Sequence, residues 1–249
     1  MMALSYEARI GVARAAVDYL MGRDAAEMTA LVPNCPGWTV YNAAVHVGRV
    51  SVAWEEMIKC TPGDTTARER AYETSGKRPT GAEPAELARW AHAAIDRMSG
   101  DASKPCFFSM TGGPGTTGLW AWHAASELGV HRLDVEAALG HEHAISDIEA
   151  VDATTYVCEF FLPAMRRAAE EDPGAVTAEL LSDTGECLHT INIDSASTHQ
   201  VTVRGSVVQV LLALWGRPHT GVDLVDGDAE VWDAWRQLPG KVFQFGTWD

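Results

Sequence analysis

Three side chains of one predicted helix have the types and the spacing of a metal site. His123, Glu127 and His131 follow one another at intervals of four residues, so a helix carries all three on one face. A neutral imidazole nitrogen and a carboxylate oxygen are both good zinc ligands, and a Glu and a His one turn apart can chelate one ion. The same spacing arises by chance on exposed helices, where it forms only a solvated polar face.

A histidine on an earlier predicted helix strengthens the metal interpretation. His46 lies beside an apolar stripe that includes Val47 and Val50, which places it near the interior of a helical bundle. A lone histidine there is more often a satisfied core residue than a ligand. However, an inward histidine on one helix and an inward Glu/His pair on another are how bundles build metal sites. Three protein ligands leave a position open, as in catalytic rather than structural zinc sites.

Asp134 follows His131 by three residues and has two interpretations. As a supporting carboxylate, it would fix the tautomer of the His131 imidazole. As a surface residue, it would instead pair with Arg132 or Arg49. The sequence favours neither interpretation over the other.

The segment GPGTTG, residues 113–118, formally matches G-x-G-x-x-G and precedes a predicted helix. A dinucleotide site also needs a β-α-β unit and an acidic residue at the end of the next strand. Here one long helix follows, with no second strand after it, so the segment is a weak nucleotide motif. Its amides lie next to a helix N-terminus, where a substrate carboxylate can bind.

Apolar spacings of three and four residues, together with capping residues, predict the helices that position these side chains. In residues 1–140 we expect a bundle of four long helices, near residues 5–31, 39–60, 84–98 and 117–139. Thr39 is the expected N-cap of the second helix, and Gly140 the expected end of the fourth. These are the two helices that carry the candidate ligands.

The pattern changes near residue 145. One more helix is predicted at residues 149–171, and β-rich segments then surround a short buried helix at 206–216 and precede a last helix. We expect an α+β fold with domains at residues 1–145 and 146–249, the second with a small antiparallel sheet.

The overall charge limits the expected partners. The chain has 249 residues and a formal net charge of −15, and so acidic a chain repels nucleic acid and anionic membranes.

Five cysteines without CxxC spacing fit free thiols in a reducing cytosol better than a disulfide framework or a zinc finger. No stretch approaches the roughly 18 uncharged apolar residues of a membrane span. We expect a cytoplasmic protein.

Three segments resemble those of one enzyme family: PGWTVYNAAVHVGRV, SELGVHRLDVEAALG and VRGSVVQVLLALWGRPHTGVDLVDGD. The first two are similar to the second and fourth helices of the DinB-like, mycothiol-dependent maleylpyruvate isomerase family. The third is similar to the start of that family's C-terminal, sterol-carrier-like domain. The resemblance implies a DinB-like, metal-binding four-helix bundle joined to a smaller sterol-carrier-like α/β domain. It also implies the metal ligands His46, Glu127 and His131, the same three that spacing and side-chain chemistry indicate.

The resemblance further implies a divalent metal and the thiol cofactor mycothiol, a sugar-linked cysteine of actinobacteria. Zinc suits two imidazoles and one carboxylate best, although nickel, cobalt or manganese also fit. The activated thiolate would isomerise maleylpyruvate to fumarylpyruvate. The negative charge that develops needs a cationic partner. Arg217 is the first candidate, although it equally suits a cap on the C-terminus of the preceding helix, and Arg49 is the second.

Two other functions remain open at this point. A mycothiol S-transferase would use the same thiolate on an electrophile or a biosynthetic intermediate, and only its acceptor pocket would differ. A non-catalytic carrier or regulator would keep the fold and bind a small apolar ligand. The expected partners are a small thiol and a small electrophilic or unsaturated acid, and the expected state is a monomer.

Overall fold

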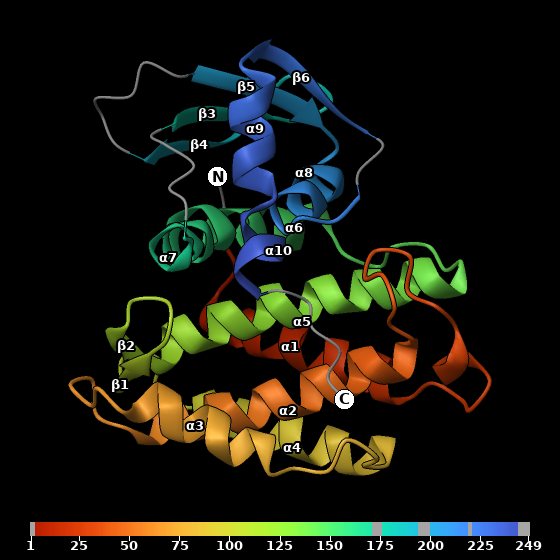
Figure 1. The fold of residues 1–249 in the computed structure, drawn as a ribbon, viewed down its shortest axis with the longest axis vertical. Coiled ribbons are helices and arrows are strands. Elements are labelled where there is room, and N and C mark those ends of the chain that lie inside the picture. Colours follow the sequence, from red (N-terminus) through yellow and green to blue (C-terminus); the bar gives the residue numbers. More distant parts are fainter. Residues whose placement is uncertain (1–2, 171–175, 194–199, 219–220, 244–249) are drawn as a thin grey trace. The chain divides into compact units, whose positions relative to one another are not determined.

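The computed structural model of the protein describes residues 3–170, 176–193, 200–218 and 221–243. The chain forms two compact units, one from Leu4 to Ala144 and one that begins at Ile145. The first unit is helical and the second combines helices with a small sheet (Figure 1). The predicted α+β fold class is therefore confirmed. The division into domains 1–145 and 146–249 as units of function stays a prediction.

Four long helices form the body of the helical unit: α1 (Tyr6–Met21), α2 (Val40–Lys59), α4 (Pro84–Met98) and α5 (Thr117–Leu139). Helix α1 packs along α5, and α2 packs along α4 (Figure 1). A short hairpin precedes α5, with strands β1 (Pro105–Phe108) and β2 (Gly113–Thr116). Most of α5 is buried on all sides, as expected of a central helix.

The helices that carry the candidate ligands begin and end where capping chemistry predicts. The Thr39 side chain accepts a hydrogen bond from the Asn42 backbone amide, and the Asn42 side chain accepts one from the Thr39 backbone amide. This reciprocal pair fixes the start of α2. Helix α5 ends at Gly140, which has a φ of 67°, a left-handed conformation that glycine adopts without steric cost.

The prediction of one helix over residues 5–31 is wrong. Helix α1 ends at Met21, and a separate 3₁₀ turn, η1, covers Glu27–Thr29. The Asp24 carboxylate accepts hydrogen bonds from the amides of Ala26 and Glu27. Such a local side-chain bond competes with the helix for backbone donors, so the chain turns here.

Helix α3 (Ala67–Gly76) is absent from the sequence-based expectations. Its buried positions are Ala67, Ala71 and Ser75, at intervals of four. Small side chains at this spacing give little hydrophobic signal, which is why apolar periodicity does not reveal the helix.

The second unit contains one four-stranded sheet and six helical segments among its described residues. The strands are β3 (Val176–Leu181), β4 (Cys187–Ile193), β5 (Gln200–Gly205) and β6 (Val222–Gly227). The helical segments are α6 (Asp147–Tyr156), a π-helical turn η2 (Val157–Phe161), α7 (Leu162–Ala168), α8 (Val207–Leu214), α9 (Ala229–Arg236) and α10 (Leu238–Phe243).

The expectation of an antiparallel sheet is wrong at its centre. The strand order is β4-β3-β5-β6, and β3 pairs with β5 in parallel. Both central strands alternate buried and exposed positions, with Val176, Ala178 and Leu180 buried on β3 and Val201 and Val203 buried on β5. The pairing of β5 with β3 makes these two apolar faces continuous. The turn residues in the sequence do not indicate which strands are neighbours.

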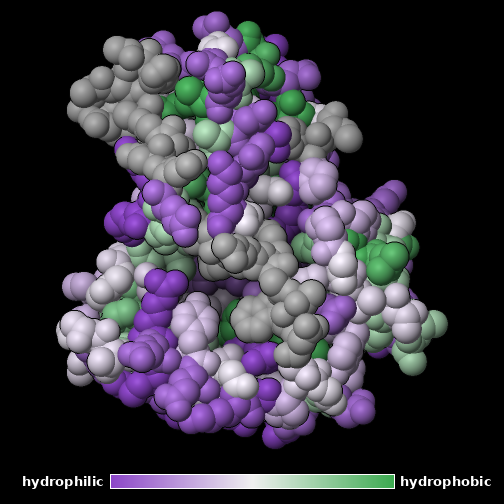
Figure 2. Space-filling model, viewed as in Figure 1, coloured by the Kyte–Doolittle hydropathy of each residue, from purple (hydrophilic) through white to green (hydrophobic). Residues whose placement is uncertain are grey.

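The visible surface of the helical unit is mostly hydrophilic, with hydrophobic side chains in small separate areas (Figure 2). Leu31 is the most exposed of the large hydrophobic residues in the described part of the chain, at 72%. Within the same part of the chain, none of the helices combines the length and the apolar character needed to span a membrane.

Candidate metal centre

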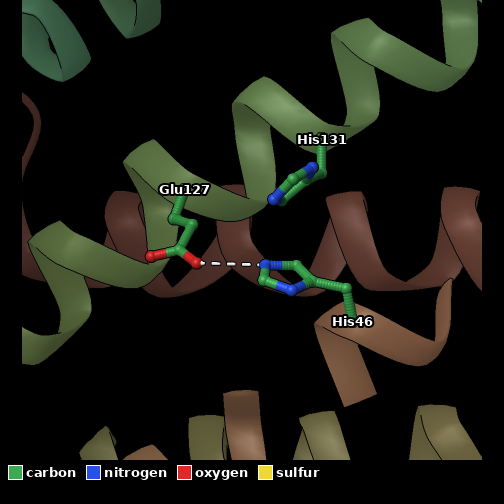
Figure 3. A group of neighbouring side chains, drawn as sticks. All are labelled: His46, Glu127 and His131. Atoms are coloured by element: carbon green, nitrogen blue, oxygen red, sulfur yellow. Dashed lines mark ion pairs between the residues drawn. The ribbon is translucent and has the colours of Figure 1, made fainter. Parts of the chain in front are cut away.

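Helices α2 and α5 bring the three predicted ligands together. His46 projects from α2, and Glu127 and His131 project from α5 toward it (Figure 3). Each side chain offers one ligand atom, and the three atoms lie within 4.8 Å of one another. His46 Nε2 is 3.6 Å from Glu127 Oε1. Two imidazole nitrogens and one carboxylate oxygen so close together fit a divalent metal with a position left open.

The three side chains are mostly buried but not sealed. Side-chain exposure is 15% for His46, 13% for Glu127 and 5% for His131. Small parts of His46 and Glu127 therefore stay accessible, while most of the cluster is shielded from water. Low dielectric surroundings strengthen electrostatic interactions with any bound ion.

Trp38, in the loop before α2, borders both histidines, a contact that the sequence analysis missed. Its ring centroid lies 5.2 Å from that of His46 and 6.1 Å from that of His131, with the latter pair stacked. The Trp38 amide donates to the Cys35 carbonyl, and the Trp38 carbonyl accepts from the Val32 amide. These bonds hold the indole against the cluster. Its place next to the predicted N-cap of α2 is the only sequence signal for it.

Asp134 is buried beside His131, which agrees in position with the first of its two interpretations. Its Oδ2 atom is 3.3 Å from His131 Nδ1, and its side chain is fully buried. It also accepts hydrogen bonds from Asn34 Nδ2 at 3.1 Å and Cys35 Sγ at 3.5 Å. Arg132, its alternative surface partner, forms an ion pair with a different carboxylate. The Asp134 and His131 side chains are within ion-pair distance, but His131 Nδ1 forms no hydrogen bond with the described residues. Control of the His131 tautomer by Asp134 therefore stays a prediction.

The electrostatics of the cluster favour an ionised Glu127. Burial raises the pKa of this carboxyl group, but His123 and His46 outweigh burial and hold the pKa well below its usual range. A carboxyl group with a lowered pKa is ionised at neutral pH, and only the ionised form is a good metal ligand.

Arg217 lies at the end of α8 and is 3% exposed. Its Nη1 atom donates to the Trp215 carbonyl at 3.2 Å, and its amide donates to the Leu212 carbonyl. Gly216, with a φ of 73°, provides the left-handed turn between them. These are the contacts of a helix C-terminal cap. The catalytic role predicted for Arg217 stays a prediction.

Arg49, the second cationic candidate, joins α2 to α3. Its side chain donates to the Gly76 carbonyl at 3.4 Å, and its own carbonyl accepts from Ser75 Oγ at 2.7 Å. Both α3 residues lie in its last turn, so Arg49 helps to place α3 against α2.

The GPGTTG segment forms strand β2 and the start of α5. Strand β2 pairs antiparallel with β1, which is not the β-α-β arrangement of a dinucleotide site. A Cβ atom at Gly115 would lie 2.2 Å from Phe108 Cβ. This glycine therefore serves close packing within the hairpin.

The comparisons with known proteins identify the family. Residues 11–136 match the family model described as the mycothiol maleylpyruvate isomerase N-terminal domain, which covers half of the chain and both ligand-bearing helices. The chain belongs to this family.

Solved structures support the fold of the mycothiol maleylpyruvate isomerase family across most of the chain. Two structures of mycothiol-dependent maleylpyruvate isomerase match with a TM-score of 0.60 each, at 15% and 16% sequence identity. The second is a variant in which one histidine is replaced by alanine. Each alignment covers 92% of this chain and 98% of the other. Identities this low establish the fold alone. A comparison with curated proteins gives no match.

Proposed function

We propose that the protein is a metal-dependent and mycothiol-dependent enzyme that isomerises maleylpyruvate. The observation that carries the proposal is the cluster of His46, Glu127 and His131 within a member of this family. The two solved structures with the same fold bear the name of this activity. The proximity of the three side chains supports the expected ligand set.

A divalent metal, with zinc the first choice, would be held by His46, Glu127 and His131 and would keep a thiol sulfur deprotonated at neutral pH. Glu127 contributes a negative charge that offsets the charge of the ion. Asp134, whose Oδ2 atom lies 3.3 Å from His131 Nδ1, would set the tautomer of His131, and the Trp38 ring lies against both imidazole rings.

The reaction then needs little more than a thiolate and a place for developing charge. When bound, mycothiol would supply a thiolate that adds reversibly to the carbon–carbon double bond of maleylpyruvate, which makes this bond single and free to rotate, and that leaves again when the trans double bond re-forms, so no thiol would be consumed. Meanwhile negative charge would lie on the conjugated carbonyl oxygen as an enolate, and the part of the protein would be to hold a cationic group beside that oxygen.

Turnover experiments test this function and separate it from its two alternatives. With zinc-loaded protein, we expect conversion of maleylpyruvate to fumarylpyruvate that requires mycothiol and leaves its concentration unchanged. An S-transferase would instead consume one thiol for each electrophile that disappears, so free thiol is titrated in parallel. The absence of any thiol-dependent turnover, with maleylpyruvate or with generic electrophiles, would favour the carrier.

The proposed cationic partner of the enolate is Arg217. If the planar guanidinium group of Arg217 stabilises this charge, Arg217→Lys should lower turnover about 10²-fold. The compact ammonium group of lysine cannot reproduce the paired hydrogen bonds of a guanidinium. Zinc content should stay the same. Arg236→Lys is the matched control, since Arg236 forms an ion pair with Asp233 on its own helix. Unchanged turnover with a lower melting temperature would instead assign Arg217 to the cap of α8.

A further inference from the structure

His123 is a third histidine beside the carboxylate of Glu127, but it approaches the other side. Its Nε2 atom is 2.8 Å from Glu127 Oε2, whereas His46 Nε2 faces Oε1 at 3.6 Å. The described residues whose ligand atoms gather within 4.8 Å are His46, Glu127 and His131, without His123. The two oxygens of one carboxylate therefore face two different environments.

Aromatic side chains from three elements fix the His123 ring. Their ring centroids lie 4.9 Å away for Trp54, 5.4 Å for Trp120 and 6.3 Å for Phe108, each in an edge-on arrangement. Trp120 is itself held by a hydrogen bond from its Nε1 atom to the Phe107 carbonyl at 2.8 Å. With only 3% of its side chain exposed, His123 has little freedom to turn away from Glu127.

Packing alone does not explain why the imidazole of His123 is buried among aromatic side chains. Burying a polar group among apolar side chains is unfavourable unless it forms a hydrogen bond, and a Phe or Leu would fill the aromatic cage without that cost. The Glu127 carboxylate is the partner that offsets the cost. A donor on Oε2 is compatible with either a neutral imidazole protonated on Nε2 or an imidazolium.

We propose that His123 is a positioning residue that makes Glu127 a one-oxygen metal ligand. Its Nε2–H donates to Oε2, so that only Oε1, the oxygen facing His46, is available to the ion. A carboxylate without this donor can bind through both oxygens, which would use a position that the thiol needs. Partners of metal ligands orient them in this way and typically change metal affinity about 10–100-fold when removed. This inference rests on the proposed metal site.

Two variants separate the hydrogen bond from the packing. His123→Phe keeps an aromatic ring in the cage but removes the donor, and His123→Gln retains a donor that can reach Oε2. Zinc affinity is measured by competition with a chelator, and the visible spectrum of the cobalt-loaded proteins reports the coordination number. We expect His123→Phe to bind zinc about 10–100-fold more weakly and to show a changed cobalt spectrum. His123→Gln should resemble the wild-type protein in both measurements.

His92→Phe is the matched control. His92 pairs with Asp18 at 2.9 Å and links α4 to α1, so this variant also breaks a histidine–carboxylate pair of the bundle, away from the cluster. Its zinc affinity and cobalt spectrum should be those of the wild-type protein. Circular dichroism establishes that each variant is folded.

Other results with these variants decide against the proposal. Wild-type behaviour of folded His123→Phe overturns it, and equal weakening in His123→Gln and His123→Phe would assign His123 to packing. If the wild-type protein binds no zinc, the proposed metal site and this inference both fail. If the wild-type protein and the His123 variants bind zinc equally tightly, only this inference fails. If His123→Phe does not fold, nitrogen NMR of the zinc-loaded wild-type protein decides instead. A protonated His123 Nε2 supports the proposal and an unprotonated one overturns it.

Discussion

Replacing His46 with alanine is expected to abolish stable metal binding while the helical bundle stays folded. His46 supplies one of the three ligand atoms within 4.8 Å, and its loss leaves two donors on a single helix. The drop in zinc affinity should exceed the roughly 10–100-fold effect that is typical of a supporting residue. Glu127→Ala and His131→Ala should act in the same way. Zinc content after dialysis against a zinc buffer measures the effect.

The fold should survive because α2 does not depend on the ion. The reciprocal Thr39 and Asn42 bonds start this helix, and its buried face packs against α3, α4 and α5. Far-ultraviolet circular dichroism of metal-free His46→Ala should therefore match that of the metal-free wild-type protein. His92→Ala serves as a control for the loss of an imidazole elsewhere in the bundle. Full zinc occupancy in His46→Ala would refute the ligand assignment.

The gathering of the candidate ligands was predictable because helices impose their own geometry on the sequence. Capping residues and apolar spacing gave α4 and α5 with the bounds that the structure shows. A step of four residues turns about 40° past a full helical turn, so His123 and His131 point roughly 80° apart with Glu127 between them. Sequence spacing thus places all three on one broad face. It does not determine which of the two histidines shares that face with His46.

Contacts that depend on loops and small side chains were not predictable. Trp38 reaches both histidines from the loop before α2, and no periodic pattern specifies where a loop side chain lies. Helix α3 packs through alanine and serine, so its apolar signal is weak. The strand pairing in the second unit was also not predictable, for a different reason. Alternation of buried and exposed residues identifies β3 and β5 as strands but does not show that they are neighbours.

The surroundings of buried charged groups also lie beyond sequence reasoning. Asp134 had a surface alternative until the structure placed it next to His131, with Asn34 and Cys35 as donors to it. Arg217 was expected to act either as a catalytic cation or as a cap on the preceding helix. Its hydrogen bond to the Trp215 carbonyl fits the cap and does not exclude a catalytic role. In each case residue type predicts a charge, whereas tertiary packing selects the partner.

Addition of mycothiol to the cobalt-loaded protein is expected to produce a sulfur-to-cobalt charge-transfer band. His46, Glu127 and His131 provide three ligand atoms, so a tetrahedral ion keeps one position for a sulfur. A thiol that coordinates an ion is deprotonated, and about one proton should be released for each site that binds. Absorption spectroscopy and a pH indicator in weak buffer measure the two effects in one titration. A carrier whose ligand lies elsewhere predicts neither the band nor the proton.

Matched ligands and variants make this titration decisive for the activated thiolate. S-methyl mycothiol keeps the sugars but has no ionisable sulfur, so it should give no proton and no thiolate band. Glu127→Ala and His131→Ala should lose the band together with the metal, whereas His92→Ala should keep it. Binding through one metal–sulfur bond should also change little with salt, because screening acts mainly on exposed charges. An unaltered cobalt spectrum at saturating mycothiol would exclude thiolate activation in this protein, for the isomerase and for the S-transferase alike.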